Sequence, residues 1–196
     1  LSFLAGGGDN AQHVFGADSS TAATQTQANI AGRRSLLRLI RFVRTLPGCE
    51  RAQVQKMMQE TAVRETYRIV GRTLITCDDY TSGRRFDDAV CYSFYPVDLH
   101  DRHGVKPQPL SLGTVPTVPL GALVPQGSRN LLVAGRSVSS DRLANSALRV
   151  QASCMAMGQA AGAAAALAAR AHTTPTDLPL DEIRSLLRQH AAIVPA

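Results

Sequence analysis

The sequence predicts a mixed α/β (α+β) fold, in which helices alternate with a few short strands. Residues 131–134, Leu-Leu-Val-Ala, form an apolar run that ends at Gly135, and such a run is typical of a strand buried on both faces. Residues 149–170 are rich in alanine, methionine and glutamine, which favours a helix. Residues 65–75 are rich in threonine, tyrosine, isoleucine and valine, which favours a further strand. Residues 90–99, VCYSFYPVDL, favour another strand, in which Pro96 marks an edge or a bulge.

The other elements are predicted from capping residues and periodicity. A Ser-Ser-Thr run at residues 19–21 can cap a helix over residues 20–46, which a Pro-Gly pair at 47–48 ends. In the helix over 149–170, Gly158 and Gly162 lie four residues apart, so we expect another backbone to approach that face closely. Further elements are expected at residues 52–58, within 78–88 and at 181–192 (helices), and at residues 118–124 (strand).

A glycine-rich segment near the start matches a dinucleotide-binding pattern only superficially. Residues 6–11, Gly-Gly-Gly-Asp-Asn-Ala, satisfy G-x-G-x-x-A. The pattern requires a helix directly after it and an acidic residue about twenty positions further on. Residues 13–16 break any helix, and no acidic residue lies between Asp18 and Glu50. We therefore interpret the segment as a glycine-rich loop, which leaves the sequence without the first βαβ unit of a dinucleotide fold.

Arginine dominates the charge of the chain. The 196 residues carry a net charge of +6, and among the 21 cationic residues only Lys56 and Lys106 are lysine. Arginine binds carboxylate and phosphate groups in a bidentate manner, which fits an anionic cofactor or substrate. The arginines of residues 33–44 leave a second interpretation open, a helix that binds nucleic acid or an acidic protein partner. We favour a solvated face, or one that contacts another part of the protein, and expect no nucleic acid partner.

Cysteine usage and hydropathy predict a cytoplasmic protein without metal. Cys49, Cys77, Cys91 and Cys154 form no CxxC pair and have no histidine at zinc-site spacing, so we expect reduced thiols. The uncharged run at residues 150–169 has the length of a membrane span, but alanine is weakly apolar and polar residues interrupt it. We therefore expect a buried helix of a soluble protein and no membrane partner.

Four motifs together resemble a family of FAD-dependent oxidoreductases. The family's closing segment resembles residues 130–162, which begin with NLLVAGR and end with CMAMGQAAG. Three more motifs occur upstream in the family's usual order: RE followed by RIVG at 64–71, SGRRFDD at 82–88 and YPVDLH at 95–100. The resemblance covers about residues 28–194. It implies part of a substrate domain (residues 1–116), followed by the closing strand and helices of a Rossmann-like FAD domain (residues 117–196).

The resemblance also implies a cofactor site. The strand glycine and the following arginine would lie beside the flavin, and the helix that begins near Arg149 would direct its N-terminus at the isoalloxazine ring, where it stabilises negative charge. A structural salt bridge is the alternative role for Arg136 and Arg149. The predicted cofactor-binding residues are Gly135, Arg136, Ser146, Ala147, Leu148, Arg149 and Val150.

A protein of this family would oxidise or reduce a small organic substrate by hydride transfer to or from FAD. His100 is the predicted catalytic residue, because it follows a strand and can take a proton from a substrate hydroxyl or amine; its alternative is a hydrogen bond within the loop. Arg68 and Arg84, together with Arg85, could bind a substrate carboxylate, or else pair with neighbouring aspartates. Tyr95 is a further predicted substrate-binding residue.

Two departures from the family pattern and the missing βαβ unit complete the prediction. Relatives usually carry Gly-Ser where Ser146-Ala147 stand and Tyr-Arg where Leu120-Gly121 stand, so a degenerate flavin site is a further alternative. The chain supplies no parallel strands beside residues 131–134. We therefore expect it to be the C-terminal piece or small subunit of a split or cleaved enzyme, incomplete without a second chain or N-terminal portion that carries GxGxxG.

Overall fold

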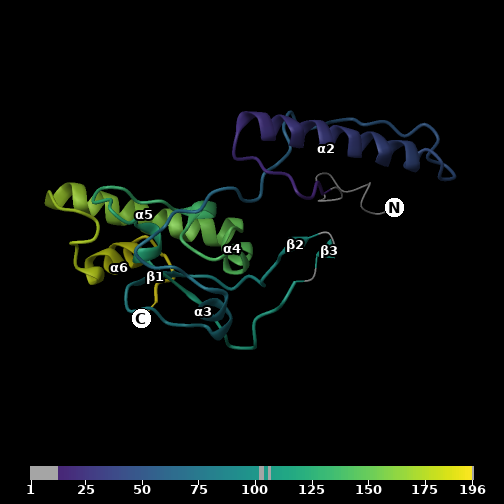
Figure 1. Cartoon of the computed structure of the whole chain (residues 1–196). Coiled ribbons are helices and arrows are strands. Elements are labelled where there is room, and N and C mark those ends of the chain that lie inside the picture. The colour runs from purple at the N-terminus through teal and green to yellow at the C-terminus, as the bar shows by residue number, and fades with distance from the viewer. Residues whose placement is uncertain (1–12, 102–103, 106, 196) are drawn as a thin grey trace. The chain divides into compact units, whose positions relative to one another are not determined.

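The computed structural model describes residues 13–101, 104–105 and 107–195, and its chain divides into two compact units, Leu1–Thr66 and Tyr67–Ala196 (Figure 1). The expected boundary between residues 116 and 117 lies inside the second unit, where strand β1 (Ala89–Tyr92) pairs with strand β4 (Thr117–Pro119). The assignment of a substrate role and a cofactor role to the two sides of that boundary stays a prediction.

The first unit consists of helix α2 (Ala22–Val43) and the segment that follows it. Thr21 caps the helix as the sequence predicts: its hydroxyl accepts the backbone N–H of Thr24 at 3.2 Å, and the Thr24 hydroxyl accepts that of Thr21 at 3.1 Å. Ala28 and Val43 are buried, whereas Leu37 is 53% exposed although the helical spacing of Leu36, Leu37, Ile40 and Val43 predicts one apolar stripe.

The helix predicted at residues 52–58 is wrong, and hydrogen bonds to α2 explain why. The Arg44 guanidinium donates to the Ala52 carbonyl at 2.9 Å, and that of Arg33 donates to the Gln59 carbonyl at 3.0 Å. Arg33 and Arg44 are separated by about 16 Å along a helix axis, whereas a helix from residue 52 to 59 would span only about 10 Å. An extended segment bridges the two anchoring points, since extended chain covers about 3.3 Å per residue.

The second unit holds two small antiparallel sheets and a group of helices. In the first sheet Cys91 lies opposite Val118 and Tyr92 opposite Thr117, with an irregularity between Ala89 and Cys91. In the second sheet β2 (His100–Asp101) pairs antiparallel with β3 (Gly104–Val105). In chain order the other elements are α3 (Cys77–Ser82), β2 (His100–Asp101), β3 (Gly104–Val105), the 3₁₀ helices η1 (Leu120–Leu123) and η2 (Gly135–Ser137), α4 (Arg142–Leu148), α5 (Gln151–Ala171) and α6 (Leu180–Gln189).

The core of this unit forms around one face of α5, which contacts both α6 and β1 (Figure 1). Residues at helical spacing on that face are buried: Ser153, Met157, Ala160, Ala164 and Ala168. Ile183 and Leu187 of α6 are almost fully buried in the same core, as the sequence predicts for the closing helix. By length and composition α5 also qualifies as a membrane span, and only 28% of its apolar window is buried in this structure, less than expected for the buried helix that the sequence predicts.

Several predicted strands are shorter than expected or absent among the described residues. Residues 65–75 contribute only single bridges, Gly71 to Pro125 and Ile75 to Ser140. Residues 131–134 form no strand: the Val133 N–H donates to the Leu123 carbonyl at 2.7 Å, and Leu131 is 51% exposed. An apolar run becomes a strand only where a neighbour supplies the ladder, and none of the described segments does so here. The predicted strands at 90–99 and 118–124 are shortened to β1 and β4, and Val97 adds a single bridge to Gln108.

The glycine prediction on α5 is also wrong. Gly158 and Gly162 are exposed, and a methyl group added at either would meet no described atom within 4 Å. Both therefore lie on the outward face of α5, and no other described segment approaches them. On this face the helix presents small uncharged residues and Met155, whose exposed fraction is 74%.

Candidate functional site

Two residues of the YPVDLH motif form a buried acid–base pair. The Nε2 atom of His100 lies 3.1 Å from Oδ2 of Asp98, and the two side chains are only 12% and 13% exposed. The second carboxylate oxygen of Asp98, Oδ1, is buried and has no hydrogen-bond partner among the described atoms. Because Oδ2 accepts the Nε2 proton of a neutral ring, Nδ1 becomes the acceptor atom of His100.

Hydrogen bonds connect this pair to α4 and to its C-cap residue Arg149, about fifty residues later in the chain. The backbone N–H of Asp98 donates to the Ser146 hydroxyl at 3.0 Å, and that hydroxyl donates to the Leu143 carbonyl at 2.6 Å. The Arg149 guanidinium donates to the Asp98 carbonyl at 3.0 Å. The predicted catalytic residue and two predicted cofactor-binding residues, Ser146 and Arg149, therefore belong to one hydrogen-bonded cluster, which we call the Asp98–His100 cluster.

The start of α5 and the turn at Gly135 lie next to each other. Val150 is the N-cap residue of α5 and forms no side-chain cap, so the first N–H groups of the helix lack that partner. Gly135 has a φ of +85°, which disfavours any other residue, and a Cβ added there would lie 3.8 Å from Cys154 Sγ of α5. The exposed Arg136 follows directly and opposes the rise that burial imposes on the pKa of the Cys154 thiol.

Three predicted cofactor-binding residues are buried inside α4. Ser146, Ala147 and Leu148 have no exposed surface. The structure therefore gives no support to direct cofactor contacts by these three, and Ser146 instead orients Asp98. The departure at Leu120-Gly121 has a similar explanation: a methyl group at Gly121 would lie 2.5 Å from the Thr73 hydroxyl, so η1 is packed too tightly for a larger side chain.

The predicted substrate-binding residues do not meet at one point. Arg68 Nε donates to the Ser140 carbonyl at 3.0 Å. Arg84 pairs with Asp79 at 2.8 Å and lies over the Phe86 ring, which is the structural alternative that the sequence left open. Tyr95 is 39% exposed, and its carbonyl accepts the Tyr80 hydroxyl at 2.8 Å.

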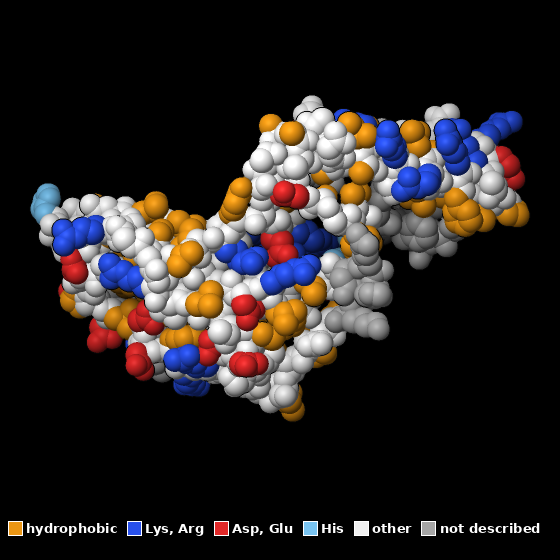
Figure 2. Space-filling view, in the orientation of Figure 1, with side chains coloured by type: hydrophobic (Ala, Val, Ile, Leu, Met, Phe, Trp, Pro, Cys, Tyr) orange, Lys and Arg blue, Asp and Glu red, His pale blue; other side chains and the backbone are white. Residues whose placement is uncertain are grey.

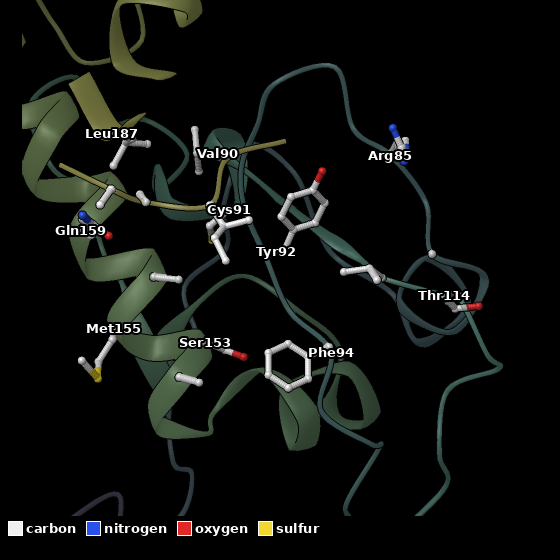
Figure 3. Close-up of a pocket in the computed structure, with 18 of the residues that line it drawn as sticks. Arg85, Val90, Cys91, Tyr92, Phe94, Thr114, Ser153, Met155, Gln159 and Leu187 are labelled. Carbon is white, nitrogen blue, oxygen red and sulfur yellow. The ribbon is translucent and has the colours of Figure 1, made fainter. Parts of the chain in front are cut away.

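A pocket of about 900 Å³ lies between β1 and α5, and pattern reasoning on the sequence did not predict it. Figure 3 shows Tyr92 and Phe94 in its centre, between α5 on one side and Arg85 and Thr114 on the other. Its volume lies within the range of natural ligand sites, about 300–1,000 Å³. The side chains of residues 90–94, on β1 and directly after it, were the available signal for a pocket wall in the sequence. The residues that complete the pocket come from four segments that lie far away in the sequence.

A chain of hydroxyl groups ties the pocket wall to the core. Tyr80 donates to the Tyr95 carbonyl, so in its 2.9 Å contact with Ser93 the Ser93 hydroxyl must be the donor. Because the single hydroxyl proton of Ser93 is donated to Tyr80, the Ser153 hydroxyl must be the donor in its 2.7 Å contact with Ser93. The chain therefore ends on a carbonyl oxygen, which cannot pass a proton on. We assign it a structural role, joining α3, β1 and α5.

The arginines of α2 belong to the first unit (Figure 2). Arg33 and Arg44 donate to carbonyls of the following segment, and most of the others lie on the exposed surface. In the part of the chain that the structure describes, no group of histidine, cysteine, aspartate and glutamate could hold a metal ion, and all four cysteines are free. The Arg-rich helix as a binding surface stays an alternative.

Comparison with known proteins identifies one family. A family model described as FAD dependent oxidoreductase matches residues 6–187. No curated protein matches the chain. No solved structure matches it either.

Proposed function

Since the chain belongs to the FAD-dependent oxidoreductase family, with FAD as its cofactor, we propose that it takes part in hydride transfer between FAD and a small organic substrate, with His100 handling the proton. The observation that carries this proposal is the Asp98–His100 cluster, which joins the YPVDLH motif to Arg149 at the start of α5. FAD, when bound, supplies the two-electron chemistry.

The residues around Gly135 fit part of such a cofactor. The left-handed Gly135 brings the backbone close to α5, Arg136 adds a positive charge at the surface, and the start of α5 has no side-chain cap. Backbone N–H groups and a guanidinium favour the negatively charged edge of a reduced ring. Gly135, Arg136, Arg149 and Val150 would hold this part of FAD.

His100 would accept the substrate proton at Nδ1. Asp98 accepts the proton on Nε2, which fixes the ring orientation, and stabilises the charge that the ring gains when Nδ1 is protonated. Arg149 holds the Asp98 backbone, and the Ser146 hydroxyl accepts its N–H, so both keep the carboxylate in position. Burial of both side chains excludes most water from the pair.

The rate of flavin reduction tests the role of His100. In the FAD-loaded assembly, His100→Gln should slow reduction by a panel of alcohols and amines by about 10²–10⁴-fold, the usual contribution of a general base. Flavin content should stay unchanged. His190→Gln, at an exposed histidine after α6, is the matched control. An unchanged reduction rate in His100→Gln would contradict the proposed role.

We further propose that the flavin site is completed by a second chain or N-terminal portion carrying GxGxxG, which covers the outward face of α5. The exposed Gly158 and Gly162 support this, because small uncharged residues allow close packing of a partner. An obligate interface of this kind buries on the order of 2,000 Å² or more.

Co-purification tests the partner. Gly158→Arg should abolish assembly and the flavin absorbance that comes with it, whereas Ser185→Arg, exposed on α6, should change neither. Thermal unfolding of each variant chain alone controls for folding. A colourless assembly that contains both pieces, or full assembly of Gly158→Arg, would refute the proposal.

A further inference from the structure

We propose that the pocket between β1 and α5 binds a small aromatic molecule that carries a carboxylate. Three apolar side chains from separate segments line it although they are largely exposed: Phe94 at 70%, Met155 at 74% and Ile193 at 82%. Each exposes apolar surface that a ligand would remove from water. The Phe94 ring and the Tyr92 ring beside it offer stacking partners for an aromatic group.

The charge of the pocket lining favours a negatively charged ligand. Arg85 is the only charged residue among those that line the pocket, and the described residues give it no ion-pair partner. None of the described residues in the wall is a carboxylate, so an anion meets no repulsion from them. Burial raises the pKa of the Cys91 thiol in this wall to about 12, so the thiol is neutral at physiological pH.

The arrangement also sets the ligand's size and orientation. Arg85 and Thr114 lie on the side opposite α5, while Ser153, Met155 and Gln159 belong to α5 (Figure 3). A carboxylate that binds the Arg85 guanidinium, with the Thr114 hydroxyl as a second donor, would direct its ring toward Phe94 and Met155. The volume of about 900 Å³ leaves room for one or two rings. Binding at this pocket requires no flavin.

Titration of the full chain with cinnamate, and with the neutral cinnamamide of the same shape, tests the inference. We expect cinnamate to bind at least about tenfold more tightly than cinnamamide, since charge-assisted hydrogen bonds are about twice as strong as neutral ones. Arg85→Gln should remove that difference. Arg129→Gln, at an exposed arginine outside the pocket, is the matched control and should retain it.

Methyl NMR identifies where the ligand binds. The chain has four methionines, and only Met155 lines the pocket, so its methyl resonance should shift on addition of cinnamate while those of Met57 and Met58 stay in place. Phe94→Ala, which removes an exposed ring and leaves the core intact, should weaken both ligands. Absence of cinnamate binding, an unmoved Met155 methyl group, or equal affinities for the two ligands in the unmodified chain would overturn the proposal, and each outcome is independent of flavin reduction.

Discussion

The order of donors in the Tyr80–Ser93–Ser153 chain predicts an asymmetry between two serine substitutions. Ser93→Ala removes the acceptor of the Ser153 hydroxyl, which is only 4% exposed, and the donor to Tyr80. An unpaired buried hydroxyl costs about 1–3 kcal/mol. Ser153→Ala leaves the hydrogen bond from Ser93 to Tyr80 intact and should cost about 0.5–1.5 kcal/mol.

The double variant should cost less than the sum of the two single variants. Once Ser93 is alanine, removing the Ser153 hydroxyl eliminates an unpaired group, so we expect a coupling of about 1 kcal/mol. Urea denaturation at fixed pH measures all three variants. For a unit of this size each kcal/mol lowers Tm by about 4 °C. Ser82→Ala, at an exposed serine, is the control. Equal costs for the two single variants, or additive energies, would refute the assigned donor order.

Three further predictions concern other parts of the chain. Burial raises the pKa of the Cys91 thiol to about 12. Cys91 should therefore react with iodoacetamide more slowly than Cys49 at about pH 8, which peptide mass spectrometry measures. Burial raises the pKa of Asp79, but hydrogen bonds from Arg84 and Thr76 outweigh burial and hold that pKa below 3.8. The stability that these bonds contribute is fully present above pH 3.8 and is lost as the pH falls through the pKa of Asp79 in the folded state. Asp79→Asn should therefore flatten the acid limb of a pH–stability curve. Gly158→Ala should stabilise the isolated chain by about 0.5–1 kcal/mol, because the site is open and helical, whereas Gly121→Ala should destabilise it, with thermal unfolding as the measurement.

Helices were predictable from the sequence because their signals are local. The Ser-Ser-Thr run gave the start of α2, and the apolar spacing at Ile183 and Leu187 gave α6. Helix α4 was missed although Asp141 was an available signal: its side chain accepts the N–H of Ala144, as an N-cap does. The same carboxylate accepts the Cys77 N–H and so joins α4 to α3, which no local pattern encodes.

Strands and site contacts were harder because they depend on distant partners. The apolar composition of residues 131–134 predicted a strand, but none of the described segments pairs with these residues as a neighbouring strand, so no strand forms. Motif resemblance singled out the segments that carry His100 and Arg149, and the structure joins them through Asp98. It could not separate exposed from buried members of the Ser146 to Val150 stretch, because burial there results from helix α4, which the sequence did not predict.

The anchoring of α6 has a consequence for synthesis on the ribosome. Arg184 donates to the carbonyls of Ala89 and Asp87, nearly a hundred residues earlier, while Ile183 and Leu187 fill the core beside α5. At about 5–20 residues per second, β1 leaves the ribosome several seconds or more before α6 does. During that interval the apolar surface of β1 lacks first α5 and then α6, the helices that cover it. Molecular chaperones that hold exposed apolar segments should therefore engage the nascent chain between the emergence of β1 and that of α6.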